Sequence, residues 1–206
     1  MKKDRLDKQL EFILAIDKEK NIFRQTYVSD ASRMENDAEH AWHMAVMCMI
    51  LSEYSEHPID KLKTMTMLLI HDLVEIYAGD TYAYAGVDAE EIHQREYAAA
   101  EKLYGMLPED QGIYFMNLWK EFEEGKSPEA QFARTMDRIQ PMMLNAATDG
   151  RAWKEHKVRL SQIMKRNEHT AEGSSVLWDY ALKHFVMPHV ESGEIIDDET
   201  HSAGLK

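Results

Sequence analysis

The chain has 206 residues, which is long enough for one sizeable domain with a full hydrophobic core. Its net charge of −13 argues against binding to long nucleic acids, because that binding depends on Lys and Arg side chains that neutralise phosphates. The only cysteine, Cys48, excludes an intramolecular disulfide and a cysteine-based zinc cluster, and together with a charged N-terminus it predicts a reducing, cytoplasmic location.

Helical patterns follow one another along the chain, with almost no strand pattern. Apolar residues recur at helical spacing in the first segment, whereas residues 21–36 are rich in Ser, Asp, Arg and Asn and are predicted to form a structured loop. Asn36 or Asp37 can cap a second helix that ends near Tyr54. Pro58 suits the first turn of a third helix that ends near Gly79.

Residues 82–87 are predicted to form a loop, and further helices are predicted over residues 88–105, 108–123, 127–148, 156–167 and 171–190. No segment approaches the roughly 18 consecutive apolar residues of a membrane span. The chain shows no repeat or linker, so we predict one all-α domain over residues 1–206. This helical bundle has its core at about 24–145, C-terminal helices at 156–190 and a polar tail at 191–206.

His71 and Asp72 stand side by side after an apolar run, residues 65–70, that is typical of a buried helix. A carboxylate and an imidazole are costly to bury without a partner, and a divalent cation would satisfy both. Neighbouring residues lie about 100° apart around a helix, so both side chains can reach one ion beside it. The pair therefore indicates a metal site that other helices complete.

His40 and Asp137 are the predicted remaining ligands. His40 lies on the preceding helix, which a short connection would pack antiparallel to the helix of His71. Asp137 is an acid within an amphipathic helix rich in Met, Ile and Leu. Two imidazoles and two carboxylates suit Mn, Fe, Co or Zn, and the ligand types alone do not choose among them.

Each of these features also has a structural explanation. A lone His-Asp dipeptide is common, and an Asp beside arginines, as at Asp137, is often a surface ion pair. His43 is one turn from His40, so either imidazole could instead contact the core or a substrate. Glu75 could be a solvated helix residue, and Asp80 could cap a turn. The joint order and spacing of the residues favour the metal site.

The order Glu39-His40, His71-Asp72 with Glu75 and Gly79-Asp80, and then Asp137 resembles the H…HD…D pattern of HD-domain metal-dependent phosphohydrolases. The resemblance covers about residues 24–145. The segments 33–40 and 71–80 are most similar to the small, single-domain 5′-deoxynucleotidase branch. The extended HDxxExxxGD segment makes the resemblance specific.

The resemblance implies hydrolysis of a (deoxy)nucleoside 5′-monophosphate to nucleoside and phosphate, with one divalent metal ion. The residues that it implies as metal ligands are His40, His71, Asp72 and Asp137. Glu75 and Asp80 are implied as catalytic acids or bases, and an arginine upstream of His40 as the phosphate contact. Arg24 lies at about the right offset and Arg33 is a second candidate.

One departure from the family pattern affects the substrate. Better-known bacterial members place a tryptophan after the phosphate-binding arginine, and it is associated with selecting deoxyribose, whereas Gln25 follows Arg24 here. Selection of deoxyribose therefore stays open. A later turn, residues 149–153, could close the pocket over substrate, although a helix-terminating turn with a packed Trp153 is the simpler interpretation.

Other functions on the same fold are hydrolysis of a triphosphate, cyclic or alarmone nucleotide, or metal and nucleotide sensing without catalysis. The first group usually has larger insertions, and intact Glu75 and Asp80 argue against a sensor. A purely structural helical scaffold is the remaining alternative. A small-molecule nucleotide is the expected partner, and exposed apolar surface on Met-rich helices makes a homodimer the expected assembly.

Overall fold

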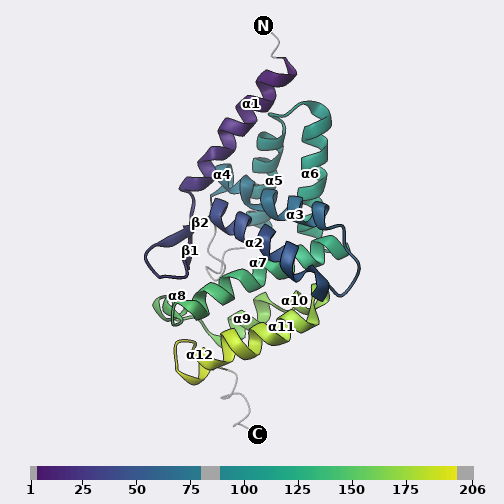
Figure 1. Cartoon of the computed structure of the whole chain (residues 1–206). Helices are drawn as coiled ribbons and strands as arrows, with labels where there is room; N and C mark the ends of the chain where they lie inside the picture. The colour runs from purple at the N-terminus through teal and green to yellow at the C-terminus, as the bar shows by residue number, and fades with distance from the viewer. Residues whose placement is uncertain (1–3, 80–88, 199–206) are drawn as a thin grey trace.

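The computed structural model describes residues 4–79 and 89–198, and most of them lie in helices (Figure 1). The longer helices are α1 (Arg5–Ile16), α2 (Asp37–Leu51), α3 (Lys61–Ile70), α5 (Ala89–Tyr104), α6 (Glu109–Glu124) and α7 (Pro128–Ala147). The shorter helices are α4 (Glu75–Ala78), α8 (Arg151–Glu155), α9 (Leu160–Arg166), α10 (Thr170–Gly173), α11 (Ser175–Ala181) and α12 (Met187–Glu191). The prediction of an all-α fold is confirmed, apart from one small sheet.

α7 crosses the middle of the molecule and organises the packing around it (Figure 1). It contacts α2, α3 and α6, and it also contacts α10 and α11 of the C-terminal part of the chain. Met44 and Cys48 of α2, Met67 of α3 and Met136 of α7 are fully buried in one core. Burial of Cys48 raises the pKa of its thiol to about 11.

The predicted loop over residues 21–36 is wrong in part, because the structure forms a hairpin there. Strand β1 (Phe23–Tyr27) pairs antiparallel with β2 (Met34–Asn36). Phe23 is more than half exposed, so the strand does not show the alternation of buried and exposed apolar residues that identifies most strands. Backbone pairing rather than side-chain burial defines this element, and the sequence pattern does not record it.

The start of α2 follows the prediction. The Asn36 side chain accepts a hydrogen bond from the Glu39 backbone N–H, and the Glu39 carboxylate accepts one from the Asn36 backbone. This reciprocal pair satisfies two of the free N–H groups at a helix start. It fixes where α2 begins and therefore where His40, in its first turn, is placed.

The predicted third helix is not continuous. α3 begins at Lys61 with Asp60 as its cap, and it gives way to a tighter 3-10 turn, η3 (His71–Val74), before α4. Gly79 ends α4 with a φ of +77°, a conformation that favours glycine. The tight turn falls on the His-Asp pair, so these two side chains leave the helix in directions that a regular helix does not give.

α7 agrees with its predicted bounds, with Ser127 as the cap and Pro128 in the first turn. Pro141 lies inside this helix and has no N–H to donate to the carbonyl of Asp137, one turn earlier. A proline within a helix usually bends it at this point. The carbonyl that loses its helical partner is therefore that of a predicted metal ligand.

The C-terminal helices are shorter than predicted. The predicted helix over residues 156–167 is reduced to α9, and the one over 171–190 is divided into α10, α11, a π turn (Leu182–Val186) and α12. Pro188 cannot donate a helical hydrogen bond to its preceding turn, which accounts for the irregularity there. Across residues 4–79 and 89–198, no helix combines the length and apolar character needed to cross a membrane.

Candidate metal centre

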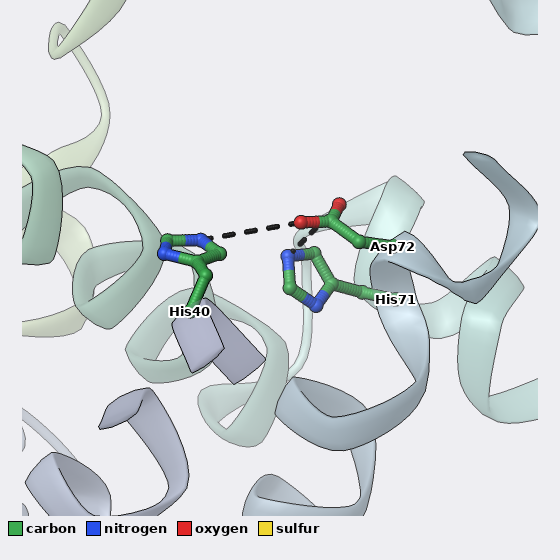
Figure 2. Close-up of side chains that lie close together, drawn as sticks. All are labelled: His40, His71 and Asp72. Atoms are coloured by element: carbon green, nitrogen blue, oxygen red, sulfur yellow. Dashed lines mark ion pairs between the residues drawn. The ribbon is translucent and has the colours of Figure 1, made fainter. Parts of the chain in front are cut away.

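Three elements that are distant in sequence bring the predicted ligands together. α2 supplies His40, the turn η3 supplies His71 and Asp72, and α7 supplies Asp137. Contacts of α2 with α3 and of both helices with α7 hold these elements side by side. Figure 2 shows the two imidazole rings and the Asp72 carboxylate facing one another.

The donor atoms lie at short distances. His71 Nε2 is 3.1 Å from Asp72 Oδ1, and His40 Nε2 is 4.0 Å from Asp72 Oδ2 (Figure 2). Asp137 Oδ1 lies 3.2 Å from His40 Nε2 and 3.9 Å from His71 Nε2. The Nε2 atoms of both histidines therefore face both carboxylates.

The other ring nitrogen of each histidine is held by a carbonyl oxygen. His71 Nδ1 is 3.0 Å from the Leu68 carbonyl oxygen, and His40 Nδ1 is 2.9 Å from Gln140 Oε1. A carbonyl oxygen can only accept, so each Nδ1 carries a proton, and when the ring is neutral its lone pair lies on Nε2. This is the arrangement that metal-binding histidines adopt.

A second observation also indicates that the centre can hold a cation. His71 Nε2 is buried and makes no hydrogen bond within the described part of the chain, although Asp72 Oδ1 is close. A buried lone pair beside carboxylates is unfavourable unless a proton or a metal ion lies between them. Two imidazoles and two carboxylates can therefore hold a divalent ion in place of those protons.

The pKa shifts of these groups reflect two opposing effects, burial and the neighbouring charges. Burial lowers the pKa of His71, but Asp72 and Asp137 outweigh this effect and raise it well above its usual value. Burial by itself raises the pKa of Asp72 and of Asp137, and the neighbouring imidazoles reverse this and lower both. Without a cation, the two carboxylates therefore favour the protonated form of His71, and the imidazoles favour the ionised form of the carboxylates.

Arg24 of strand β1 reaches into this cluster. Its Nη1 donates to Asp72 Oδ2 at 2.8 Å and to Asp37 Oδ1 at 3.1 Å, and its side chain is only 14% exposed. Burial lowers the pKa of Arg24, but the charges of Asp72 and Asp137 outweigh it and raise it. The hairpin, which the sequence did not predict, is what places this predicted arginine at the centre.

The other predicted residues are placed differently. Arg33 is half-exposed and binds Glu39 with both of its terminal nitrogens, at 2.7 and 2.6 Å, so the structure does not bring it to the centre. Glu75 follows η3 directly, in the first turn of α4, and is partly buried. Asp80 lies outside the described residues.

Gln140 is a member of the centre that the sequence did not reveal. It is fully buried, and its Nε2 donates to Glu35 Oε1 at 2.7 Å and to His43 Nδ1 at 3.2 Å. These two contacts fix the amide so that its oxygen faces His40. The one feature of the sequence that could have indicated this role is that Gln140 lies three residues after Asp137, on the same face of the helix.

Two buried acids were also missed. Asp37 is fully buried and pairs with Arg24, and the sequence suggested only a capping role for it. Glu19, in the 3-10 turn η1 (Asp17–Asn21), is buried and has a pKa raised to about 7 by burial and by the charges of Asp72 and Asp37. No local sequence pattern indicates that Glu19 is buried. Its turn follows α1 directly, in a stretch of charged residues.

The turn at residues 149–153 is closer to the structural interpretation. Trp153 is 3% exposed and packs against His189. Arg151 lies over the ring of Tyr27, 4.0 Å from its centroid, and binds Glu155. The turn therefore supports the hairpin that carries Arg24 and does not itself reach the cluster of His40, His71 and Asp72.

Comparison with known proteins agrees with this geometry. The family model described as "HD domain" matches residues 16–178, which is most of the chain. The chain belongs to the HD-domain family. This HD-domain match extends beyond the resemblance over residues 24–145 and includes α9, α10 and part of α11.

Curated relatives and a solved structure add to the match. The human 5′-deoxynucleotidase HDDC2 is 30% identical over 67% of this chain and 66% of its own length, and the bovine protein of the same name is 32% identical over the same shares. The chain thus matches just under two thirds of these relatives. A crystal structure described as a predicted metal-dependent phosphohydrolase, from Magnetospirillum magnetotacticum MS-1, is 41% identical with a TM-score of 0.86, covering 93% of this chain and 95% of that one.

Proposed function

We propose that the protein is a metal-dependent phosphohydrolase that converts (deoxy)nucleoside 5′-monophosphates to nucleoside and phosphate. The observation that carries the proposal is the centre itself, in which two histidines anchored at Nδ1 turn Nε2 toward the carboxylates of Asp72 and Asp137. Relatives named as 5′-deoxynucleotidases support the choice of substrate class.

We propose His40, His71, Asp72 and Asp137 as the ligands of one divalent ion. Mn, Co, Fe and Zn are all compatible with this mixture of nitrogen and oxygen ligands. When bound, such an ion polarises a phosphoryl oxygen and lowers the pKa of a coordinated water. Gln140 and the Leu68 carbonyl hold the imidazoles in the tautomer that binding needs.

Arg24 is the proposed phosphate contact. Its guanidinium already lies against Asp72, so a phosphate that approaches the centre meets a buried cation. Arg33 is engaged with Glu39 at the start of α2, which makes it the weaker candidate. Arg24 orients the substrate and offsets its negative charge among buried carboxylates.

Glu75 is the proposed proton-transfer group. It begins α4 immediately after the turn that carries His71 and Asp72, which supports a role next to the proposed ligands. A carboxylate there can take a proton from the attacking water or return one to the leaving oxygen. Asp80 is retained as a second proposed acid on the resemblance alone.

A homodimer and a cytoplasmic location complete the proposal. Leu6, Leu10, Ile13 and Leu14 of α1 are 56–75% exposed, and this apolar surface can be buried against a second copy. The single, buried cysteine suits a reducing compartment. Light scattering of the purified protein tests the dimer, and fractionation of source cells tests the location.

A substrate panel tests the proposed reaction. Phosphate release is measured from ribo- and deoxyribonucleoside mono- and triphosphates with Mn, Co, Zn or Mg. We expect monophosphates to be hydrolysed and triphosphates to be poor substrates, and the ribose-to-deoxyribose ratio decides the selectivity that Gln25 leaves open. A protein that binds metal and releases no phosphate from any nucleotide would contradict the proposal.

Glu75→Gln separates chemistry from binding, with Glu101→Gln on the exposed side of α5 as its control. We expect Glu75→Gln to retain metal and to slow turnover about 10²- to 10⁴-fold, the usual contribution of general acid–base catalysis. If Glu75→Gln instead lost the metal, the role assigned to Glu75 would be wrong.

A further inference from the structure

A cavity of about 320 Å³ lies beside α7, next to the proposed metal centre. Its walls come from the loop between α6 and α7, from one face of α7, and from the end of α9 with α10. The volume is within the range of small-molecule sites. The lining residues that matter below are Lys126, Arg134, Arg138, Arg166, His169 and Glu172.

The charge of this cavity is opposite to that of the chain. Four of its lining residues are Lys or Arg and two are Glu, whereas the whole chain has 24 basic and 37 acidic residues. Glu172 also accepts hydrogen bonds from His169, at 2.7 Å, and from Gln131, at 3.3 Å. The basic residues outnumber the acidic ones in this hollow, and an excess of positive charge attracts anions.

Arg134 is held in place by the loop that covers it. Its Nη1 donates to the Glu123 carbonyl at 2.9 Å, which uses one of the five N–H groups of a guanidinium. Gly125 has a φ of +62°, and a Cβ there would lie 2.6 Å from Arg134 Nη1. Glycine suits the positive φ of this loop, and the hydrogen bond to the Glu123 carbonyl orients the Arg134 side chain along the cavity wall.

The opposite wall is fixed by a second glycine. A Cβ on Gly173 would lie 2.4 Å from both the Gln131 carbonyl oxygen and Thr135 Oγ1, so α10 packs directly on α7 only because glycine is present. Thr135 Oγ1 also donates to the Thr170 carbonyl at 2.8 Å. Both walls are therefore built into the fold, which distinguishes the cavity from a solvated cluster of surface arginines.

Arg138 marks the boundary with the metal centre. Its Nη1 lies 3.5 Å from Asp137 Oδ2, while the same side chain lines the cavity. The adjacent residues Asp137 and Arg138 thus project toward two different sites from one turn of α7. The cavity adjoins the proposed metal centre and does not share the His40, His71 and Asp72 donors.

We propose that this cavity binds the phosphate group of a small anion as a second site. Arginine is the side chain best suited to bidentate contacts with phosphate oxygens, and a preformed cationic hollow offers several such donors. Free phosphate and a nucleoside monophosphate share this chemistry, and the cavity has room for either. The proposal does not depend on hydrolysis at the metal centre.

Calorimetric titration of the full-length protein tests the proposal by counting phosphate sites. The test variant is Lys126→Gln with Arg166→Gln, because both side chains are exposed and Arg134 also supports the loop. The control is Lys154→Gln with Lys165→Gln, which removes the same charge from exposed positions outside the cavity. Inorganic phosphate is the first probe.

We expect the test variant to have one phosphate site fewer than the control, or to bind at that site at least about tenfold more weakly. If the metal centre also binds phosphate, the control should show two phosphate sites and the test variant one. If the proposed function fails and the metal centre binds no phosphate, the control should show one site and the test variant none. Failure of the second site and failure of the proposed function are therefore distinguishable. Equal counts and equal affinities in the two variants would overturn the second site.

Deoxyadenosine monophosphate and deoxyadenosine identify the source of the phosphate, in a Glu75→Gln background that slows turnover. Tighter binding of the monophosphate than of inorganic phosphate at the second site supports a nucleotide ligand, and equal binding supports free phosphate. Binding of deoxyadenosine at that site as tight as that of its monophosphate would contradict recognition through phosphate.

Discussion

Two neighbouring regions of α7 differ in the burial and in the sign of their charged side chains. The region around Asp137 is closed, and its carboxylates and imidazoles are nearly inaccessible to solvent. The region around Arg134 and Arg138 lines a cavity in which basic residues outnumber acidic ones. The difference indicates that the buried region needs an internal cation to complete it, whereas the open region can take an anion from solution.

The means of fixing the side chains differ as well. In the closed region, hydrogen bonds from Gln140 and the Leu68 carbonyl set the orientation of the imidazoles. In the open region, glycines allow backbone to pack against the side chains and keep a wall in place. Mutations in the closed region should therefore change metal binding, whereas mutations in the open region should change only the binding of its ligand.

The largest effect is expected from Asp72→Ala, which removes a charged ligand from the closed region. We expect metal content near zero and turnover at background, because the remaining donors cannot offset the cation's lost hydration. Metal analysis and phosphate release measure this, with Asp179→Ala on the exposed face of α11 as the control. Full metal content in Asp72→Ala would refute the ligand assignment.

Two arginines of the hairpin give the next largest effect. Arg24 lies among the buried carboxylates and Arg33 binds Glu39 near the surface. We expect Arg24→Gln to lower kcat/KM about 10- to 100-fold, the value of a charged hydrogen bond to phosphate, mainly through KM. Arg33→Gln is expected to change it less than about threefold, as exposed ion pairs contribute little. The reverse order would transfer the phosphate contact to Arg33.

Gln140→Leu tests the hydrogen bond that holds His40. Loss of a partner behind a metal ligand typically weakens metal binding about 10- to 100-fold, and we expect a loss in this range. Gln111→Leu is the control, since that partly buried amide bonds Gln9 between α6 and α1. Circular dichroism confirms folding of both variants. Unchanged metal affinity in Gln140→Leu would mean that the His40 tautomer is set in another way.

The four proposed ligands could be picked out of the sequence because their signal is local, and their role as ligands stays a prediction. Each is a polar residue at a conspicuous place in a helical pattern, and packing of the three elements then gathers them. Helix starts were equally local, as the Asn36–Glu39 pair shows. The metal itself stays a prediction, as do the roles of Glu75 and Asp80.

What the sequence did not predict depends on distant partners. Hairpin β1–β2 is defined by pairing between backbones rather than by an apolar pattern, and Gln140 acquires its role only when α2 packs on α7. The tight turn at His71 likewise interrupts a pattern that reads as one helix. In each case the tertiary contact, absent from any short window of sequence, decides the local structure.

Glu19→Gln has the smallest expected effect. It measures how much the ionisation of Glu19, which is buried near Asp72 and Asp37, lowers the free energy of unfolding. Its pKa of about 7 exceeds the usual 4.5, so from pH 4.5 to 7 the folded protein keeps a proton that the unfolded chain releases. Stability of the metal-free protein should therefore fall as pH rises through this window and level off above it. Glutamine removes this loss, so we expect Glu19→Gln to be stabilised by about 2 kcal/mol at pH 8 and by nothing at pH 4. Urea unfolding at both pH values measures it, and a gain that is equal at pH 4 and pH 8 would show that burial and the charges of Asp72 and Asp37 do not raise the pKa of Glu19.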